Sequence, residues 1–389
     1  MPQDLSTQLI HHPYQPPTGF AAPQPGVHKA STVLFDNVAA LRDRDWRRRD
    51  AYTYGLHGTP TTMLLEERIA TLEGALQCLL VPSGLAAVSL VDLALLAAGD
   101  EVLLPDNVYG PSKELARHEL SRWGISHRFY DPLDAAGLEQ AISDKTRLIW
   151  LEAPGSITME FPDLPALVAA AKARGVMTAL DNTWGAGVAL RGFDLGIDVV
   201  MQALTKFPSG GGDVLMGSVC TRDEPLHQRI KATHMHLGWG VGANDAEMVL
   251  RSLATVSLRY AAQDVAGRKL ATWLAKRPEI ARVLHPALQD SPGHAYWAEH
   301  CTQAAGLFSV LFKPRYTQAQ VDHFVDSLQL FGIGYSWAGP MSLAVPYKLA
   351  TMRSPKPGME GHLVRFSMGL EAVADLIADV EQALTRAFG

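Results

Sequence analysis

Cysteine is scarce in this sequence, with 3 residues in a chain of 389. The residues concerned, Cys78, Cys220 and Cys301, lie far apart along the chain. This spacing excludes a cysteine metal knuckle and a small fold held together by disulfides. We therefore expect a protein that works in a reducing compartment.

Long apolar runs are also lacking. The longest, Leu90–Gly99, would span about half a bilayer, and it contains Asp92. The chain begins Met1-Pro2-Gln3-Asp4, without the basic start and apolar run of a signal peptide. These absences predict a cytoplasmic protein with no membrane partner.

No charge of one sign dominates the chain. Lys and Arg total 34 against 40 Asp and Glu, which gives a formal net charge of −6. Such a balance does not suit binding to nucleic acid or to an anionic membrane. The basic run Arg42–Arg49 is interrupted by Asp43 and Asp45, so a solvated face or salt bridges between subunits explain it better. A Gly-x-Gly-x-x-Gly motif after a first strand is absent too, which disfavours a dinucleotide-binding oxidoreductase.

The chain has the length and apolar content for a large core. At roughly 100–200 residues per domain, 389 residues predict two domains with room for an arm. Hydrophobic residues make up 47% of the chain and charged residues 19%, which argues against disorder. Five prolines between Pro13 and Pro25 predict an extended arm over residues 1–58. We place a large domain at 59–253 and a smaller C-terminal domain at 254–389.

The large domain alternates between helix-like and strand-like segments. Helices are expected at Thr61–Glu73, Ser83–Ala98, Ser112–Trp123, Asp134–Ile142 and Asp163–Arg174. Strands are expected at Cys78–Val81, Glu101–Leu104, Ser126–Tyr130, Leu148–Glu152, Val176–Leu180, Val199–Ala203 and Val214–Cys220. This alternation predicts an α/β fold, with a mainly parallel sheet covered by helices on both faces. Ligands bind such sheets at the carboxyl ends of the strands.

The C-terminal part has a different pattern. A long helical stretch over Ala243–Ala275 comes first. Strand-like segments follow at Leu307–Phe312, Leu330–Tyr335 and Leu363–Phe366, and a helix over Glu371–Phe388 closes the chain. This order predicts a smaller α+β domain.

Two of the expected strands are followed by residues suited to a flat, phosphorylated ligand. Ser83-Gly84-Leu85 opens a helix, where free backbone N–H groups can hold a phosphate. Such turns are common, however, and most bind nothing. Tyr109 follows the next strand and can stack on a planar ring, although a tyrosine packed under a loop is an equal explanation.

Two later strands end in groups that can react with or anchor such a ligand. Asp181 ends a buried strand, where a carboxylate requires a partner such as a pyridinium nitrogen; a helix N-cap is the alternative. Lys206 stands where a strand meets a Gly-rich loop and can form a Schiff base, although a single lysine is more often a surface charge. Taken in order, the four features predict a pyridoxal phosphate site: phosphate cradle, ring stack, nitrogen anchor and Schiff-base lysine.

With this constellation the sequence resembles the Cys/Met-metabolism family of fold type I pyridoxal-phosphate enzymes. The resemblance runs over nearly the whole chain, from Thr7 to Glu371. Its specific strings are Tyr54-Gly55-x-x-Gly58-Thr59-Pro60-Thr61, Ser83-Gly84, Pro154-Gly155-Ser156-Ile157-Thr158-Met159-Glu160, Asp181-Asn182-Thr183-Trp184, Gln202-Ala203-Leu204-Thr205-Lys206, Tyr335-Ser336-Trp337 and Leu363-Val364-Arg365. It implies a transferase-like large domain with a mainly parallel seven-stranded sheet and a smaller C-terminal domain.

The resemblance also implies a role for each matching residue. The cofactor would be held by Lys206 as the Schiff-base lysine, Asp181 at the pyridine nitrogen, Tyr109 on the ring, and Gly84, Leu85 and Thr205 at the phosphate. The substrate carboxylate would be bound by Arg365, with Ser336, Trp337 and Tyr109 lining the pocket. Tyr54 would reach into the neighbouring subunit's site, in a homotetramer built from dimers that share active sites. Lys206, Tyr109 and Tyr54 are the residues implied to act in catalysis.

The sequence departs from the family pattern at three places. Leu56, followed by His57, stands where an arginine usually contacts the phosphate. Ala203 stands where a serine is common, and Gly211-Gly212-Asp213 replaces the usual Gly-His-Ser-Asp. We expect looser cofactor retention than in relatives that have the arginine.

The chemistry implied is a carbon–sulfur lyase reaction in methionine biosynthesis. L-Cystathionine would undergo β-elimination to homocysteine, pyruvate and ammonia. A γ-specific member, such as cystathionine γ-lyase, cystathionine γ-synthase or methionine γ-lyase, is the near alternative. Three features favour β: no carboxylate in Trp337–Ser342, Pro154-Gly155-Ser156 in place of Pro-x-Asn, and Trp184 in place of a common Phe.

Two other possibilities carry less weight. A non-catalytic binding protein on the same scaffold need not keep Lys206, Asp181 and Arg365 together. His234 and His236 alternate on one helix and do not face one point, so we expect no metal site. Which sulfur amino acid the enzyme prefers is left open by the sequence.

Overall fold

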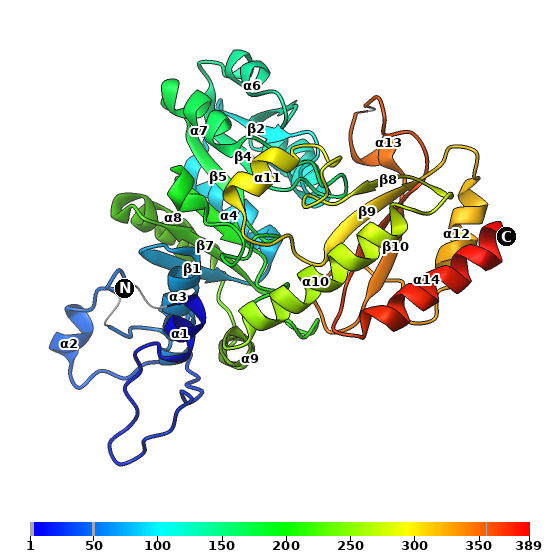
Figure 1. The fold of residues 1–389 in the computed structure, drawn as a ribbon. Coiled ribbons are helices and arrows are strands. Elements are labelled where there is room, and N and C mark those ends of the chain that lie inside the picture. Colours follow the sequence, from blue (N-terminus) through cyan, green and yellow to red (C-terminus); the bar gives the residue numbers. More distant parts are fainter. Residues whose placement is uncertain (1–3, 49–50, 355) are drawn as a thin grey trace.

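A computed structural model describes residues 4–48, 51–354 and 356–389. Met1–Gln3, at the start of the chain, and Arg49, at the end of the basic run, therefore lie outside the described residues. The first part of the chain is an arm with little regular structure, containing helices α1 (Leu5–Ile10) and α2 (Val38–Arg42) and a short turn of helix, η1 (Gly55–His57). The arm lies along one side of the molecule, next to α3 (Pro60–Glu73) (Figure 1).

The larger of two sheets has seven strands in the order β1-β7-β6-β5-β4-β2-β3. Their bounds are β1 Gln77–Val81, β2 Glu101–Pro105, β3 Ser126–Tyr130, β4 Thr146–Glu152, β5 Met177–Asp181, β6 Val199–Gln202 and β7 Gly217–Thr221. Strands β2 to β6 pair in parallel, and β7 runs antiparallel to both β1 and β6. The expected mainly parallel seven-stranded α/β sheet is confirmed.

Helices cover both faces of this sheet because its strands are apolar on both sides. In β1, Leu79 and Val81 pack into one core with α4 (Gly84–Leu95) and α8 (Glu224–Leu237). Cys78 and Leu80 point to the opposite core, which includes residues of α3 and α7 (Leu164–Ala173). The other elements are α5 (Gly110–Glu114), the π-helical turn η2 (Leu115–Leu120), α6 (Ala135–Ala141), η3 (Gly192–Leu195) and α9 (Ala243–Leu253).

Local sequence signals fix where the site-bearing helices begin. Thr59 caps α3 in a capping box with Thr62, and Gly74 ends that helix with a φ of 70°. Ser83 caps α4, accepting a hydrogen bond from the backbone N–H of Ala86 at 3.0 Å. The start of α4 is thereby held at the carboxyl end of β1.

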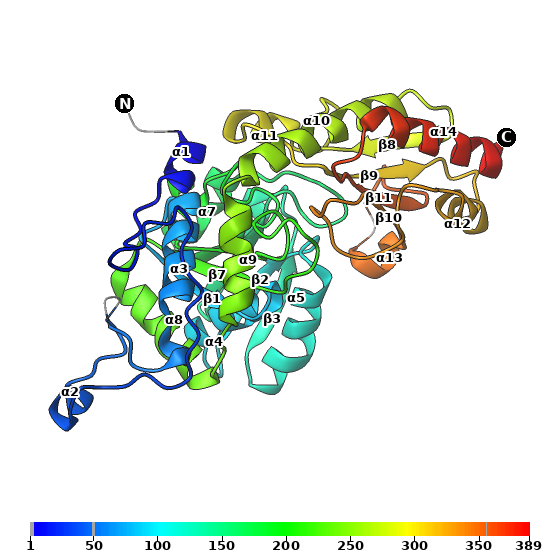
Figure 2. The same cartoon turned by 90° about the horizontal axis from the view of Figure 1, so that it is seen from below.

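The smaller sheet is antiparallel, in the order β10-β11-β9-β8. Its strands are β8 Ile280–Leu284, β9 Leu307–Phe312, β10 Leu343–Tyr347 and β11 Leu363–Ser367. Helices α10 (Val256–Leu274), α12 (Gln318–Asp326) and α14 (Val373–Phe388) share one apolar core with it. Two short helices, α11 (His294–His300) and α13 (Leu349–Met352), complete this part of the chain, which lies to one side of the large sheet (Figure 2).

Several expected elements differ from the structure. The stretch Ala243–Ala275 is two helices, because Thr255 leaves helical geometry and its hydroxyl donates to Ser252 O at 3.1 Å. Leu330–Tyr335 is not a strand; only Gly332 bridges to Leu343. The helix expected to reach Ala98 ends at Leu95. Strands β8 and β10 were not expected. The domain limits at 58 and 253 stay a prediction.

Within the described residues, no helix is both long and apolar enough to cross a membrane.

Candidate active site

The site is built where the parallel strands end. β4 ends at Glu152 and β5 at Asp181, and these two residues are register partners. Lys206 follows β6, and Tyr109 precedes α5 shortly after β2. Residues far apart in the sequence therefore meet at one edge of the sheet, as expected for a ligand site of this architecture.

Lys206 is a largely buried amine with a hydroxyl partner. Its Nζ donates to Ser336 Oγ at 2.6 Å and lies 5.5 Å from the ring centroid of Trp337. Burial, and then the nearby charge of Arg365, lower the pKa of Lys206 from 10.5 to about 8, while Asp181 opposes the shift. A neutral, nucleophilic amine is therefore available much closer to neutral pH than on a solvated lysine.

Asp181 is held by its own loop and tied to the strand that precedes Lys206. Its Oδ1 accepts from the backbone N–H and the hydroxyl of Thr183, at 2.9 and 2.5 Å. The same hydroxyl oxygen accepts from the N–H of Ala203 at 2.9 Å. Both bonds that the described residues make to this carboxylate use Oδ1, so Oδ2 is available to a ligand. Burial raises the pKa of Asp181, while the bonds from Thr183 and the charge of Lys206 oppose this.

Arg365 supplies a buried guanidinium from the smaller sheet. It is 8% exposed, and its Nη2 donates to Ser336 O at 3.1 Å. Its guanidinium lies 5.2 Å from the ring centroid of Tyr347, and among the described residues its Nε has no partner. A buried guanidinium with an unused donor suits an incoming carboxylate.

Ser336 joins the amine to the guanidinium. It accepts from Lys206 through Oγ and from Arg365 through its carbonyl. Its φ is 89°, and Ala338 has a φ of 65°, both rare for residues with a side chain. The expected strand over Leu330–Tyr335 is replaced by an irregular loop that delivers Ser336 and Trp337 to the site.

The start of α4 forms a narrow cradle. A Cβ placed on Gly84 would lie 2.6 Å from the Cβ of Ala203, so only glycine fits without a shift. The backbone of Gly84 and Leu85 presents N–H groups at this helix start, which suits a phosphate. The hydroxyl of Thr205 instead donates to Met216 O at 3.2 Å and accepts from Met216 N at 3.1 Å, so its expected phosphate contact stays a prediction.

Tyr109 and Tyr54 lie in different settings. Tyr109 stands before α5, and burial, then Asp181 and Glu152, raise its pKa. Tyr54 belongs to the arm and is 46% exposed, with its ring 5.8 Å from that of His57. Within the described part of this chain, the ring contact of Tyr54 is with His57, and its role in a neighbouring subunit's site stays a prediction.

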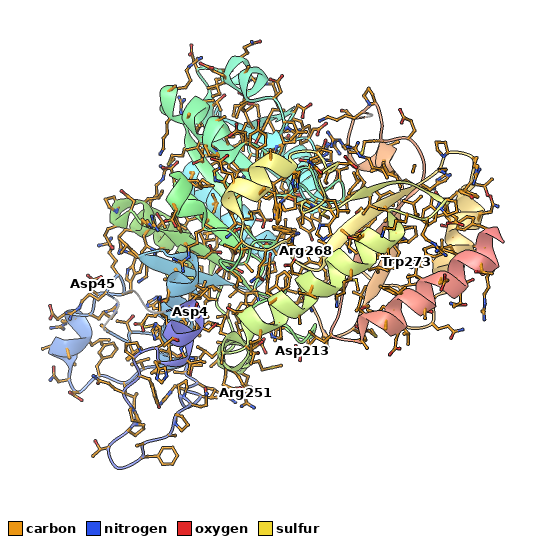
Figure 3. The ribbon with its side chains drawn as sticks, in the orientation of Figure 1. Asp4, Asp45, Asp213, Arg251, Arg268 and Trp273 are labelled. Carbon is orange, nitrogen blue, oxygen red and sulfur yellow. The ribbon has the colours of Figure 1, made fainter. Side chains whose placement is uncertain are left out.

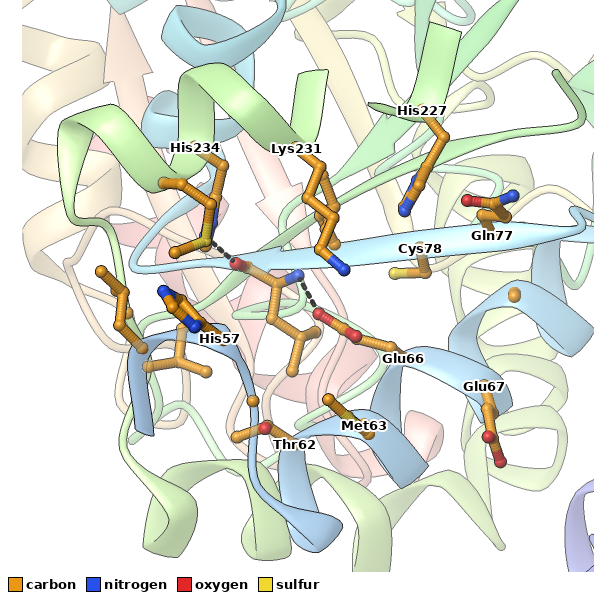
Figure 4. A pocket seen from close by; sticks show the side chains of 18 of the residues that line it. His57, Thr62, Met63, Glu66, Glu67, Gln77, Cys78, His227, Lys231 and His234 are labelled. Atoms are coloured by element: carbon orange, nitrogen blue, oxygen red, sulfur yellow. Dashed lines mark hydrogen bonds between the residues drawn. The ribbon is translucent and has the colours of Figure 1, made fainter. Parts of the chain in front are cut away.

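A small cavity of about 70 Å³ lies beneath the turn that carries Leu56 and His57 (Figure 4). Its walls come from α3, β1 and α8, including Glu66, which accepts from Leu80 N at 3.1 Å. His234 of the same wall is buried and bonded to Leu80 O at 3.0 Å, whereas His236 is exposed. None of the residues expected to bind the cofactor lines this cavity.

Two site residues were missed from the sequence. Glu152 is buried and accepts from the N–H of Tyr109 at 2.8 Å; the available signal was a carboxylate ending a buried strand, as at Asp181. Tyr347 packs on Arg365 from a strand that was itself missed. Sequence reasoning could not find Tyr347, because an aromatic residue in a short apolar segment carries no site signal.

The arrangement fits the expected pyridoxal phosphate. A partly buried amine, a partly buried carboxylate with an oxygen that accepts no bond from the described residues, and a narrow glycine cradle match the aldehyde, the ring nitrogen and the phosphate of that cofactor. The buried Arg365 lies outside this set and matches the carboxylate of an amino acid. Without such a ligand, the charges of these residues would lack complementary groups, and this would reduce the stability of the fold.

Comparison with known proteins gives a consistent result. Residues 6–385 match the family of Cys/Met metabolism PLP-dependent enzymes. A cystathionine beta-lyase of Bordetella avium is 42% identical over 389 residues, covering 97% of this chain and 97% of that protein. The cystathionine beta-lyase MetC of Escherichia coli K12 is 35% identical over 390 residues, covering 98% of each. A crystal structure of cystathionine gamma synthase from Xanthomonas oryzae, in complex with aminoacrylate and cysteine, is 28% identical with a TM-score of 0.90, covering 100% of this chain and 99% of that one.

Proposed function

We propose that this chain, which belongs to the Cys/Met metabolism family of PLP-dependent enzymes, is a cystathionine β-lyase, a carbon–sulfur lyase that converts L-cystathionine to homocysteine, pyruvate and ammonia. The observation that carries the proposal is the grouping of Lys206 and Asp181, at the edge of the larger sheet, with Arg365 from the smaller sheet. The full-length likeness to two proteins named cystathionine beta-lyase supports it.

The cofactor would be held by Lys206, Asp181, Tyr109 and the start of α4. When bound, pyridoxal phosphate supplies an electron sink that stabilises negative charge at the substrate Cα. Asp181 favours the protonated ring nitrogen on which this property depends, because a buried carboxylate is stabilised by an adjacent positive charge.

The chain's own groups then position the substrate and move protons. Arg365 binds the α-carboxylate bidentately, and Tyr347 packs against its guanidinium. Lys206 Nζ, with a pKa of about 8, can take up the Cα proton and release it again near neutral pH. Ser336 Oγ keeps Nζ within reach of the site at 2.6 Å. The apolar ring of Trp337 beside Nζ limits the access of water.

The pocket wall supports β- over γ-elimination. Along Trp337–Ser342 no acidic side chain faces the site, since the loop contains none. Gly339 O accepts a hydrogen bond from Gln263 at 2.9 Å, and Ser342 bonds to Glu371 at 2.7 Å. These bonds hold the loop that forms this wall in place. Trp184 is 4% exposed and packs on Phe161, so any influence it has on specificity acts through packing.

A γ-type reaction is the second candidate. It is favoured by the fold, because a cystathionine gamma synthase superposes over the full chain with a TM-score of 0.90. Few contacts separate such activities, so the products decide between them.

We further propose that the enzyme is a cytoplasmic homotetramer built from dimers that share active sites. The exposed apolar residues of the arm support an interface there; they include Phe20 at 67%, Leu34 at 89% and Val38 at 57% exposed. Three free cysteines, two of them buried, support a reducing compartment. Sedimentation of the cofactor-loaded protein would measure the assembly.

The test of the proposed function is a product assay. Cofactor-loaded protein is incubated with L-cystathionine, and the keto acid and thiol are identified by mass. Pyruvate with homocysteine is the expected result. 2-Oxobutyrate with cysteine would overturn β-elimination in favour of the γ-type reaction.

A further inference from the structure

Two carboxyl groups lie side by side at the edge of the sheet that forms the site. Glu152 ends β4 and Asp181 ends β5, and their Cα atoms are register partners in the parallel ladder. Glu152 is 7% exposed. Asp181 is partly buried. Two neighbouring carboxyls with limited access to water do not ionise together easily, because each negative charge raises the cost of the other.

The hydrogen bonds of the two carboxyls join different parts of the chain. Those of Asp181 run to Thr183 in its own loop. Oε2 of Glu152 accepts from the N–H of Tyr109, which lies on a different segment, at 2.8 Å, and the carboxyl also bonds to Ser156. Glu152 thus fixes the backbone beneath the expected ring-stacking tyrosine and the loop that begins at Pro154.

The charges around Glu152 do not provide it with a cationic partner. The titratable groups that face it are Asp181 on β5, Tyr109 before α5, Lys113 on α5 and Tyr130 on β3. Lys113 directs its Nζ to the carbonyls of Asp106 and Met352. Among the described residues, Glu152 enters no ion pair. A buried carboxyl in this position is more stable when it is neutral.

We propose that Glu152 is a positioning residue that carries the proton of the Glu152–Asp181 pair, so that Asp181 holds the negative charge for the ring nitrogen while Glu152 fixes Tyr109. This inference rests on the proposed cofactor site. Lys206 is near Asp181 and favours its ionised form, which assigns the charge to Asp181 and the proton to Glu152.

The direction of the pKa shift of Glu152 agrees with this assignment of the proton. Burial, and then the charge of Asp181, raise the pKa of Glu152 from 4.5 to about 8, while the hydrogen bonds from Ser156 and Tyr109 oppose this rise. In the unfolded chain the same carboxyl ionises near its ordinary value. Because the folded pKa is raised, the folded state holds an extra proton between about pH 4.5 and about pH 8, so this residue costs stability progressively as the pH rises through that window.

The decisive variant is Glu152→Gln, compared with Glu152→Ala. The amide is a neutral isostere of a protonated carboxyl, and its oxygen can still accept from Tyr109. We expect Glu152→Gln to bind pyridoxal phosphate within about threefold of the unaltered chain, and Glu152→Ala to bind it about tenfold more weakly. If Glu152→Gln is as impaired as Glu152→Ala, the negative charge of Glu152 is what matters and the proposal is wrong.

A second measurement needs no cofactor. The melting temperatures of the apo forms are followed from pH 5 to pH 9, a range of about four units around the titration window. The difference between Glu152→Gln and the unaltered chain should shift in favour of the variant as the pH rises, and level off above about pH 8. A difference in melting temperature that does not change with pH would overturn the proposal. Failure of the chain to bind the cofactor would instead count against the proposed function, and would leave this measurement valid.

The matched control is Glu160→Gln. Glu160 is also a buried glutamate, but it pairs with the guanidinium of Arg353 and with Lys356 Nζ at 3.3 Å. Its partners are two cations, so a neutral amide would leave both of them without this carboxylate. We expect Glu160→Gln to melt at a lower temperature than the unaltered chain across this pH range. Equal behaviour of the two glutamine variants would contradict the assignment of the proton to Glu152.

Discussion

Clusters of charged side chains occur in two regions of this molecule and are compensated in different ways. The first region, here called the ion-pair network, comprises Asp106, Asp131, Glu160, Arg353 and Lys356. Arg353 Nη2 lies 2.7 Å from Asp106 Oδ1 and also pairs with Glu160, and Lys356 Nζ lies 2.6 Å from Asp131 Oδ1. In the active site, by contrast, Lys206, Asp181 and Arg365 enter no ion pair with any described residue, and their bonds run to hydroxyl, N–H and carbonyl groups.

The difference separates a structural role from a binding role. In the ion-pair network, Arg353 and Lys356 follow α13, whereas Asp106 and Asp131 follow β2 and β3, so the pairs join the smaller sheet's segment to the larger sheet. In the active site, the charged side chains are hydrogen-bonded to neutral groups and have no ion-pair partner within the described part of the chain, because the ligand supplies the complementary groups. A fold keeps incompletely compensated buried charges at a cost in stability, and such groups cluster at functional sites.

The largest effect is expected from removing the reactive amine. Lys206→Ala should lower kcat at least about 10³-fold, because general acid–base catalysis alone contributes roughly 10²–10⁴-fold and covalent attachment of the cofactor is lost as well. The measurement is pyruvate release from L-cystathionine, with Lys145→Ala, an exposed lysine, as the control. Substantial activity in Lys206→Ala would show that another group is the reactive amine.

Breaking the ion-pair network should instead affect stability. Arg353→Met leaves Asp106 without its cation and Glu160 with Lys356 as its remaining cation, and should lower the free energy of unfolding by about 3–5 kcal/mol. Chemical denaturation measures it. The control is Arg251→Met: this arginine is labelled in Figure 3, its side chain is 76% exposed, and it pairs with Glu247 at 2.6 Å. Removing such an exposed pair should cost less than about 1 kcal/mol. Equal losses in the two variants would mean that the network is no more stabilising than a surface pair.

The pH dependence of cofactor loading reports directly on the site. Below its pKa of about 8, Lys206 is protonated and cannot attack an aldehyde; above it, the amine is free. The initial rate of pyridoxal phosphate loading should therefore rise with pH and level off near pH 8, about two units below the value for a solvated lysine. Arg365→Leu should move the plateau to higher pH, because Arg365 lowers this pKa. A plateau near pH 10, about the ordinary value, would show that Lys206 is solvated.

The smallest effect is expected at the arm. Leu56 packs close to Gly240, with its Cδ1 3.1 Å from where a Cβ of that glycine would lie. If Tyr54 and its neighbours reach the partner's phosphate, Leu56→Arg adds a charged donor there and should tighten cofactor binding up to about tenfold. Dialysis against cofactor-free buffer measures retention. An unchanged dissociation constant would place the phosphate clamp elsewhere.

Features that depend on neighbouring residues in the sequence were predicted, whereas features that depend on contacts between distant segments were not. The strand ends carrying Asp181 and Lys206 were found because a buried strand followed by a polar residue is a local pattern. The role of Glu152 depends on its register with Asp181 across two strands, which the sequence does not display. Ser336 and Trp337 were found only through the family resemblance.

The smaller sheet was predicted less well for a physical reason. The segment Leu330–Tyr335 is apolar enough for a strand, yet the loop turns here so that Ser336 reaches both Lys206 and Arg365. The break at Thr255 lets α9 pack on α3 while α10 packs on the smaller sheet, where Arg268 lies near the middle of the helix (Figure 3). Tertiary contacts of this kind override helix and strand periodicity.

The central claim is that the incompletely compensated charges of the active site are there for the cofactor, with Lys206 as its point of attachment. The most direct test is to load the protein with pyridoxal phosphate, reduce it with borohydride, digest it and locate the modified lysine by mass spectrometry. We predict a single adduct, on the peptide that contains Lys206. Modification of another lysine in place of Lys206, or no adduct at all, would contradict the account.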